Sequence, residues 1–223
     1  IIINSPNNPT GRVMSKEELL QIADLARENP NINILSDEIY ELILKKEFKH
    51  YSLSSLANDL KDRIFIINGF AKGWAMTGWR IGYLVGPKDV IKASSALQSQ
   101  STSNVCSFVQ KGALEALKIN NEFFSMINSH YDQRRRLLYE GLNNINGIYI
   151  EEPNGAFYAF PKLPNSSITS VDFCNKALQD YGLVVVPGKA FGADQCIRIS
   201  CAASEIKIKD GLQRLEKAIS EYY

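Results

Sequence analysis

The feature that most constrains the fold is a set of short apolar runs, rich in β-branched residues, that alternate with helical patterns. Runs at residues 1–3, 32–36, 64–67 and 81–85 have the composition of buried strands. Between the first two runs, Ser15-Lys-Glu-Glu18 forms a capping box, and apolar residues recur behind it at helical spacing. Strands that alternate with helices predict an α/β fold whose sheet is largely parallel and buried on both faces.

Polar residues that suit catalysis follow three of these predicted strands. Asn8 lies after the first strand, Asp37 stands at the end of the second, and Lys72 lies just beyond the third. In open α/β sheets, ligands bind outside the carboxyl ends of the strands. We therefore expect these three residues to contribute to one site.

From residue 87 onward the pattern changes, first to long helices and then to a mixture of helices and short strands. The expected helices cover residues 89–99, 104–118, 122–144, 171–181 and 204–220. The expected strands of the last part lie near Tyr149 and at residues 156–160, 183–186 and 197–200. We place a domain boundary near residue 120.

Composition excludes several classes of partner. The chain has 25 basic and 24 acidic side chains and a net charge of +1, so it has no basic field to attract nucleic acid or a membrane surface. No apolar run approaches the length needed to span a bilayer. The four cysteines show no paired spacing, which predicts buried, reduced thiols in a cytosolic protein.

Two further groups of charged or titratable residues are expected to carry no site. His50 and His130 lie far apart, with no carboxylate or cysteine pattern around them, so we expect no metal site. The run Arg134-Arg135-Arg136 is expected to lie on a solvated helix face.

Lys72 and Arg80 occur among small and apolar residues in the stretch FAKGWAMTGWRIG. A lysine enclosed by apolar groups can act as an imine-forming nucleophile or a base, although a lysine in a Gly/Ala loop is more often solvated. The guanidinium of Arg80 suits phosphate or carboxylate. A structural salt bridge is the alternative, because an unpaired arginine at the entry to a buried strand would be costly.

Asp37 and Tyr40 occur together in the stretch LSDEIY. A carboxylate at a buried strand end could pair with a protonated ring nitrogen and keep that nitrogen cationic. The alternative for Asp37 is the N-cap of a helix that begins in DEIYELIL. The alternative for Tyr40 is an aromatic residue of the core.

Five motifs occur in the order SPNNPTG, SDEIYE, NGFAKGWAMTGWRIGYLVGP, GAFY and CIRIS. Together they resemble the class I aminotransferases that use pyridoxal phosphate, and the resemblance is nearest to the bacterial aspartate aminotransferase branch that includes prephenate aminotransferases. It implies an aspartate aminotransferase-like fold, with a mostly parallel sheet in a large domain and an α+β small domain. Residues 1–120 would be the C-terminal part of the large cofactor-binding domain, and residues 121–223 the small C-terminal domain.

The resemblance implies a role for each candidate residue around the cofactor. Lys72 forms a Schiff base with pyridoxal phosphate and then moves a proton between the substrate α-carbon and the cofactor. Asp37 pairs with the pyridine nitrogen, so that the ring can accept electrons. Tyr40 and Asn8 hydrogen-bond the phenolic oxygen, and Arg80 binds the phosphate.

The same resemblance makes Arg198, in CIRIS, the clamp for the substrate α-carboxylate, which Asn8 would also touch. The alternative for Arg198 is a surface arginine on an edge strand. The bond before Pro9 is a candidate cis peptide. One position departs from the family pattern: Gly69 stands where many relatives have a serine that contacts the phosphate, and we interpret it as a feature of this branch.

The implied activity is transfer of an amino group between an amino acid, aspartate being favoured, and a 2-oxo acid such as 2-oxoglutarate, in a cytoplasmic homodimer. The alternatives are prephenate, aromatic or alanine specificity, or, from another class, the aminotransferase-like sensor domain of a transcription regulator. The chain starts without Met, in a strand-like run. We therefore expect an upstream part, which the family uses for cofactor stacking and for contacts to the substrate side chain.

Overall fold

The computed structural model describes residues 1–164 and 168–223. Contacts between residues divide the chain into two compact units. The first unit contains residues 1–6, 13–44 and 48–125, and the second contains residues 7–12, 45–47 and 126–223. The second unit therefore includes two short segments that come from the first quarter of the chain.

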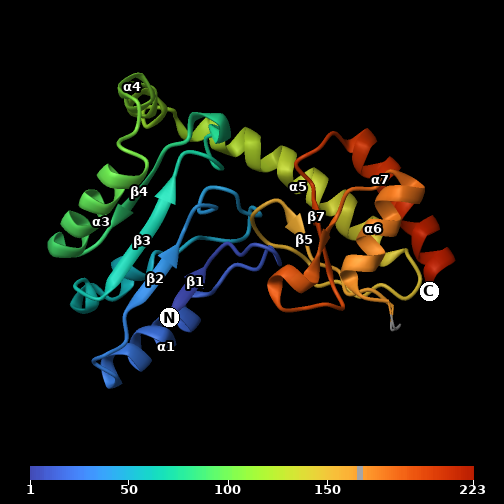
Figure 1. The fold of residues 1–223 in the computed structure, drawn as a ribbon, viewed down its shortest axis with the longest axis horizontal. Helices are drawn as coiled ribbons and strands as arrows, with labels where there is room; N and C mark the ends of the chain where they lie inside the picture. Colours follow the sequence, from blue (N-terminus) through green and yellow to red (C-terminus); the bar gives the residue numbers. More distant parts are fainter. Residues whose placement is uncertain (165–167) are drawn as a thin grey trace. The chain divides into compact units, whose positions relative to one another are not determined.

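The first unit contains a sheet with the strand order β1-β2-β3-β4 (Figure 1). Its strands are β1 (Ile2–Asn4), β2 (Ile34–Asp37), β3 (Ile64–Gly69) and β4 (Gly82–Val85). The first three are parallel and β4 is antiparallel to β3, so the predicted α/β class with a largely parallel sheet is confirmed. Burial on both faces is not observed at the edge strands, where Ile2 is 75% and Val85 is 51% exposed, because an edge strand has only one neighbour.

Helix α1 (Lys16–Glu28) begins at the predicted capping box. The Glu18 N–H donates to Ser15 Oγ at 3.2 Å, and the Ser15 N–H donates to Glu18 Oε2 at 2.9 Å. The helix buries Leu19 and Ala23 in one cluster with Ile34 of β2, and this cluster also includes the short helix α2 (Leu53–Leu56). The cap and the apolar face together hold α1 against the sheet.

Three longer helices follow β4 along the chain. They are α3 (Lys88–Ser101), α4 (Ser107–Ala116) and α5 (Asn121–Asn143), in agreement with the sequence prediction to within three residues at each end. Helix α5 begins in the first unit and continues into the second. No helix in the described part of the chain is long and apolar enough to cross a membrane.

The second unit combines an antiparallel sheet with the larger part of α5 and two helices of its own (Figure 1). The strands β5 (Tyr158–Ala159), β6 (Val186–Pro187) and β7 (Ile197–Ser200) lie in the order β5-β7-β6. The helices are α6 (Ser170–Tyr181) and α7 (Glu205–Tyr222). Leu142, Phe173 and Ile197 are fully buried in its core, which confirms the predicted α+β pattern.

Three of the predicted strands in this unit are shorter than expected, and one of them is β5, which covers only Tyr158–Ala159 of the predicted 156–160. The strand near Tyr149 is reduced to an isolated antiparallel bridge between Tyr149 and Lys162. The strand predicted at residues 183–186 begins only at Val186. Leu183 and Val185 instead pack against the hydrophobic core of the unit. These apolar residues therefore pack against the core and do not extend strand β6.

The arginine run on α5 does not lie on a solvated face as a whole. Arg135 is only 3% exposed, donates from Nη1 to the Ala156 carbonyl and pairs with Asp132, one helical turn earlier. Arg136 is exposed and pairs with Glu140. The prediction is therefore wrong for Arg135, because the run is longer than one face of a helix and turns one member inward.

The cysteine prediction holds for three residues of four. Cys174, Cys196 and Cys201 are buried free thiols, whereas Cys106 is exposed. Burial raises the pKa of both Cys174 and Cys201 to about 11, which keeps these thiols protonated at neutral pH. They are packing residues and not reactive groups.

Candidate functional site

The carboxyl ends of β1, β2 and β3 lie at one edge of the first sheet because these strands are parallel. Asp37 ends β2, beside Asn4 of β1, and its half-buried carboxylate accepts a hydrogen bond from the Ile39 N–H at 3.2 Å. Burial raises the pKa of this carboxyl, the Ile39 N–H lowers it, and the charge of Glu38 raises it. A cationic N–H donor would offset the cost of burying this charge.

The segment after Asp37 is a turn, so the alternative reading of Asp37 as a helix N-cap is wrong. The Glu41 N–H donates to the Glu38 carbonyl at 2.9 Å, which closes the turn around Tyr40. Tyr40 is only 3% exposed, and Lys72 Nζ lies 5.8 Å from the centre of its ring. The structure therefore brings Tyr40 and Lys72 together, as predicted for residues of one site.

Hydrogen bonds within the loop after β3 connect the positions of Lys72 and Arg80. Thr77 Oγ donates to the Ala71 carbonyl at 2.8 Å, and Arg80 Nη1 donates to the Thr77 carbonyl at 2.9 Å. The Ala75 N–H donates to the Lys72 carbonyl at 3.0 Å. The loop is therefore compact, and its hydrogen bonds fix the position of the lysine relative to the arginine.

Helix α4 holds this loop through its small residues. Trp74 donates its indole N–H to the Ala116 carbonyl at 3.1 Å. A Cβ on Gly112 would lie 2.4 Å from an atom of the Trp79 ring, so the ring occupies space that only glycine leaves free. Met76 is buried in one cluster with Ala113 and Ala116. These contacts explain why small residues recur on this face of α4.

Arg80 is exposed and has a left-handed backbone conformation, with φ of 54°. In residues 1–164 and 168–223, no carboxylate forms a salt bridge with it. The salt-bridge alternative is therefore wrong. Its guanidinium has five N–H donors in all and makes one hydrogen bond within the described residues, so it retains donors for an anion.

Gly69 lies opposite Gly82 where β3 and β4 pair. A Cβ at position 69 would be 2.7 Å from the Cα of Gly82 and 2.9 Å from the carbonyl oxygen of Ile81. Real Cβ atoms do not approach backbone atoms so closely. The departure from serine at this position thus has a steric reason in this chain.

In the second unit, Arg198 lies on β7, the central strand of its sheet, so the edge-strand alternative is wrong. Its Nη1 donates to Asn8 Oδ1 at 2.9 Å. Its Cζ lies 4.6 Å from the centre of the Tyr158 ring and 5.1 Å from that of Phe191. The structure thus brings together Asn8 and Arg198, and it adds two rings that the sequence analysis did not assign to the site.

The loop that carries Asn8 is fixed by the segment before β5. The Asn154 and Gly155 N–H groups both donate to the Gly11 carbonyl, at 2.9 and 2.8 Å. Gly11 has φ of +72°, and a Cβ there would lie 2.5 Å from Cβ of Pro153. The bond before Pro9 is cis, as predicted, and so is the bond before Pro6. The motifs SPNNPTG and GAFY are therefore packed together.

His50 does not lie apart from carboxylates, contrary to the expectation from the sequence. Its Nε2 is 3.1 Å from Glu38 Oε2 and 4.0 Å from Glu41 Oε2. The three groups offer ligand atoms within 4.8 Å of one another, a spacing that could also hold a metal ion. No local motif relates His50 to either glutamate, because the chain between them folds through turns without a helical or strand period.

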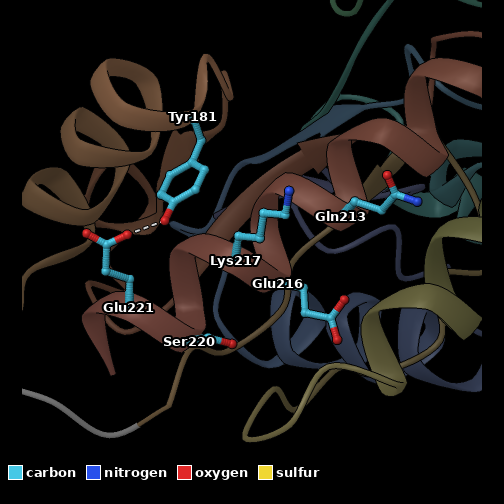
Figure 2. Close-up of a pocket in the computed structure, with 6 residues that line it drawn as sticks. All are labelled: Tyr181, Gln213, Glu216, Lys217, Ser220 and Glu221. Atoms are coloured by element: carbon cyan, nitrogen blue, oxygen red, sulfur yellow. Dashed lines mark hydrogen bonds between the residues drawn. The ribbon is translucent and has the colours of Figure 1, made fainter.

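One surface pocket of the second unit is lined by none of the predicted site residues. Figure 2 shows its side chains, most of which belong to α7. Tyr181, at the end of α6, donates its hydroxyl to Glu221 of α7. The lining residues are Tyr181, Gln213, Glu216, Lys217, Ser220 and Glu221. The pocket therefore adds nothing to the candidate site.

The candidate residues offer functional groups with distinct chemical roles. In the first unit they offer an amine, a carboxylate, a phenol and a guanidinium; in the second, an amide and a guanidinium. A half-buried carboxylate fits a ring N–H, an amine fits an aldehyde, and an exposed guanidinium fits a phosphate. The residues of the first unit thus fit pyridoxal phosphate, and Arg198 fits a carboxylate.

Comparisons with known proteins agree with these features. The family model for aminotransferase class I and II matches residues 1–215. A probable aspartate/prephenate aminotransferase of Rickettsia felis is 41% identical, over 98% of this chain and 56% of its own length. An aspartate aminotransferase of Pyrococcus horikoshii is 40% identical, over 98% of this chain and 56% of its own length. The chain thus spans little more than half the length of these relatives.

Solved structures of aminotransferases are also similar to this chain. The aspartate aminotransferase of Thermus thermophilus with maleate has a TM-score of 0.89 and 40% identity, over 97% of this chain and 56% of that one. An aromatic aminotransferase of Pyrococcus horikoshii has a TM-score of 0.91 and 37% identity, over 99% of this chain and 59% of that one. The predicted aspartate aminotransferase-like fold is confirmed for the region that this chain covers.

Proposed function

Because the chain belongs to the class I and II aminotransferases, we propose that it serves the pyridoxal-phosphate-dependent transfer of an amino group between an amino acid and a 2-oxo acid. Pyridoxal phosphate, when bound, supplies an aldehyde that condenses with amines and a ring that accepts electrons from the substrate α-carbon. The main support for the proposal is that Lys72 lies close to buried Tyr40. The distance from Lys72 Nζ to the centre of the Tyr40 ring is 5.8 Å.

The proposed roles in the first unit follow from the chemistry of each side chain. Lys72 would hold the cofactor through its amine, and the free amine would move a proton at the substrate α-carbon. Asp37 accepts a hydrogen bond from the ring N–H and so keeps the proton on that nitrogen. Tyr40 would donate to the phenolic oxygen, and Arg80 would bind the phosphate.

Arg198 is proposed to bind the substrate α-carboxylate. Asn8 accepts from Nη1, and the rings of Tyr158 and Phe191 lie against the guanidinium, so these three residues fix its plane. A fixed plane lets the fork of N–H donors meet both carboxylate oxygens at little cost in side-chain entropy. This role accounts for an arginine in the middle strand of a sheet.

Aspartate and 2-oxoglutarate are the proposed substrates, since aspartate is named in both curated relatives described above. Prephenate, aromatic or alanine specificity is the alternative. Steady-state rates of the full-length protein with aspartate, with glutamate plus prephenate and with phenylalanine decide between these. A dominant rate with phenylalanine would overturn the aspartate proposal.

We further propose a cytoplasmic homodimer, with residues 1–120 in a large domain and 121–223 in a small one. The free thiols suit a reducing compartment. Phe108 and Leu117 of the α4 region, 71% and 60% exposed, offer apolar surface that a second copy could cover. Sedimentation of the full-length protein tests the dimer, and a monomer at micromolar concentration would contradict it.

Two variants test the site directly in the full-length protein. Lys72→Ala should abolish the absorbance of the imine between the protein and the cofactor, because the amine that forms it is gone. Arg80→Ala should keep that absorbance and weaken cofactor binding by about tenfold or more, the value of one charged hydrogen-bonded pair. An unchanged spectrum in Lys72→Ala, or no spectral response to any amino acid in the wild type, would refute the proposed activity.

A further inference from the structure

Four polar side chains near the proposed cofactor residues are joined by hydrogen bonds or close polar contacts, and we term them the Glu41 brace. Glu38 follows Asp37, Glu41 follows Tyr40, and Asn68 precedes Lys72 by four residues. His50 is the fourth member and comes from the loop before α2. Glu38 and Asn68 are 3% and 4% exposed, so the brace contains polar groups that must be satisfied internally.

The centre of the brace is a hydrogen bond between Asn68 and Glu41. Asn68 Nδ2 donates to Glu41 Oε1 at 2.7 Å, while Asn68 Oδ1 accepts the N–H of Gly69 at 2.7 Å. Both ends of one amide group are thus used. The residue after Tyr40 is thereby tied to the end of β3, from which the chain runs on to Lys72.

Glu38, just after β2, and His50 lie next to this bond and are held in place by hydrogen bonds of their own. Glu38 Oε1 accepts from Ser36 Oγ at 2.9 Å and from Ser52 Oγ at 3.0 Å, and Glu38 Oε2 lies 3.1 Å from His50 Nε2. His50 Nδ1 is buried and has no hydrogen-bond partner among the described residues. A proton on Nδ1 would therefore be an unsatisfied donor, which favours the tautomer with the proton on Nε2, facing the glutamates.

The brace also affects the electrostatics near the proposed site. Burial raises the pKa of Glu41, Asn68 lowers it by donating to the carboxylate, His50 also lowers it and Glu38 raises it. Tyr83 of β4 lies opposite Asn68 in the ladder, and its pKa is raised by burial and then by the charges of Glu41 and Glu38. The titratable groups that face Glu41 are therefore Glu38, His50 and Tyr83.

We propose that Glu41 and Asn68 are positioning residues of the cofactor site, whose hydrogen bond sets the distance between Tyr40 and Lys72. This inference rests on the proposed function. The turn at Tyr40 and the loop at Lys72 leave the sheet from neighbouring strands, β2 and β3, and the Glu41–Asn68 bond joins them beyond the last ladder pair of Asp37 with Ile67. The Leu42 side chain also packs against Gly73 in the loop, since a Cβ at Gly73 would lie 2.8 Å from Leu42 Cδ1, so the Glu41–Asn68 bond adds a directional, polar link to this apolar contact.

The hydrogen bonds favour positioning over a metal centre at Glu38, Glu41 and His50. Oε1 of each glutamate already accepts from a neutral donor, and the proton on His50 Nε2 points to Glu38 Oε2. A metal ion would have to displace that proton before it bound. Metal analysis of the purified full-length protein gives a direct check: a stoichiometric ion that His50→Ala removes would overturn the positioning role.

The main experiment compares variants of the full-length protein that remove or keep the hydrogen bond. Glu41→Ala and Asn68→Ala each remove it, whereas Glu41→Gln keeps an oxygen that can accept from Asn68. Glu47→Ala, at an exposed glutamate of the same connecting segment, is the matched control. The readouts are the dissociation constant of pyridoxal phosphate and the pH midpoint of the cofactor absorbance, with circular dichroism to verify folding.

We expect Glu41→Ala and Asn68→Ala to weaken cofactor binding by about tenfold and to shift the pH midpoint, since the Tyr40 hydroxyl no longer has a fixed distance from the cofactor oxygen. Glu41→Gln should stay within about twofold of the wild type, as should Glu47→Ala. The double variant Glu41→Ala/Asn68→Ala should be no worse than the worse single variant, because both remove the same bond.

The outcomes separate this inference from the proposed function. If Lys72→Ala loses the cofactor absorbance while Glu41→Ala and Asn68→Ala match the wild type, the positioning role is wrong and the function stands. If Lys72→Ala keeps the absorbance, the proposed function itself fails. If Glu41→Ala does not fold, Asn68→Ala and Glu41→Gln still decide, because a weak-binding Glu41→Gln would show that charge and not the hydrogen bond matters.

Discussion

Replacement of Gly69 by serine tests whether backbone packing, and not cofactor chemistry, selects glycine at this position. A Cβ at position 69 would stand 2.7 Å from the Cα of Gly82 and 2.9 Å from the Ile81 carbonyl oxygen. Carbon atoms pack best at about 3.5–4.0 Å, so the new atom needs roughly 0.8 Å or more of additional space. Both contacts are with backbone, which cannot rotate away as a flexible side chain can.

The strands β3 and β4 must therefore separate at this pair, and overpacking of this kind costs about 1–3 kcal/mol. Urea unfolding of the cofactor-free full-length protein measures the loss, with fluorescence of Trp74 and Trp79 as the signal because both lie in the loop after β3. Gly78→Ser is the control, since a Cβ at Gly78 meets nothing within 4 Å. We expect Gly78→Ser to stay within about 0.5 kcal/mol of the wild type.

The same variant also reports on cofactor binding. If serine at position 69 could be accommodated, its hydroxyl would be placed to contact the phosphate and binding would tighten. Our account predicts no gain in affinity, because the displaced strand end moves the loop that carries Lys72 and Arg80. Equal unfolding midpoints for Gly69→Ser and Gly78→Ser, together with tighter cofactor binding by Gly69→Ser, would refute the steric reasoning.

Four further expectations follow from single contacts. Arg198→Lys keeps the charge but loses the planar fork, and should lower kcat/KM for dicarboxylic substrates by about 10–100-fold in steady-state assays. Ser15→Ala removes the α1 cap and should cost about 1 kcal/mol in urea unfolding. Gly211→Ala, where a new Cβ meets only Leu183 at 3.8 Å, should stabilise the fold by up to about 1 kcal/mol, measured in the same way. Burial raises the pKa of Asp37 in the folded state above its value in the unfolded state. The free energy of unfolding therefore falls as the pH rises from the unfolded pKa through the folded pKa. The cofactor-free Asp37→Asn variant should lose less stability over that pH range.

Local signals in the sequence predicted what depends on local structure. The capping box located the start of α1, because both of its hydrogen bonds join residues within one turn. Asp37 was placed at a strand end because a β-branched run precedes it. Resemblance to a family, and not the residue pattern, supplied the link between Asn8 and Arg198, which lie 190 residues apart and are joined by a hydrogen bond.

Contacts that depend on tertiary structure were missed or misread. His50 meets Glu38 and Glu41 only after a series of turns with no sequence period. Arg135 is buried although its neighbours in the run are more exposed, because the direction of a helical side chain depends on which face packs. A salt bridge was the alternative for Arg80, but the residue is exposed, because the loop and not the strand determines its surroundings.

Chemical trapping of the bound cofactor shows which lysine carries it. The full-length protein, loaded with pyridoxal phosphate, is reduced with borohydride, digested and analysed by mass spectrometry. We expect the cofactor mass to be attached to Lys72, and the attachment to disappear in Lys72→Arg. Attachment to a different lysine, or none in a preparation that still transfers amino groups, would contradict this expectation.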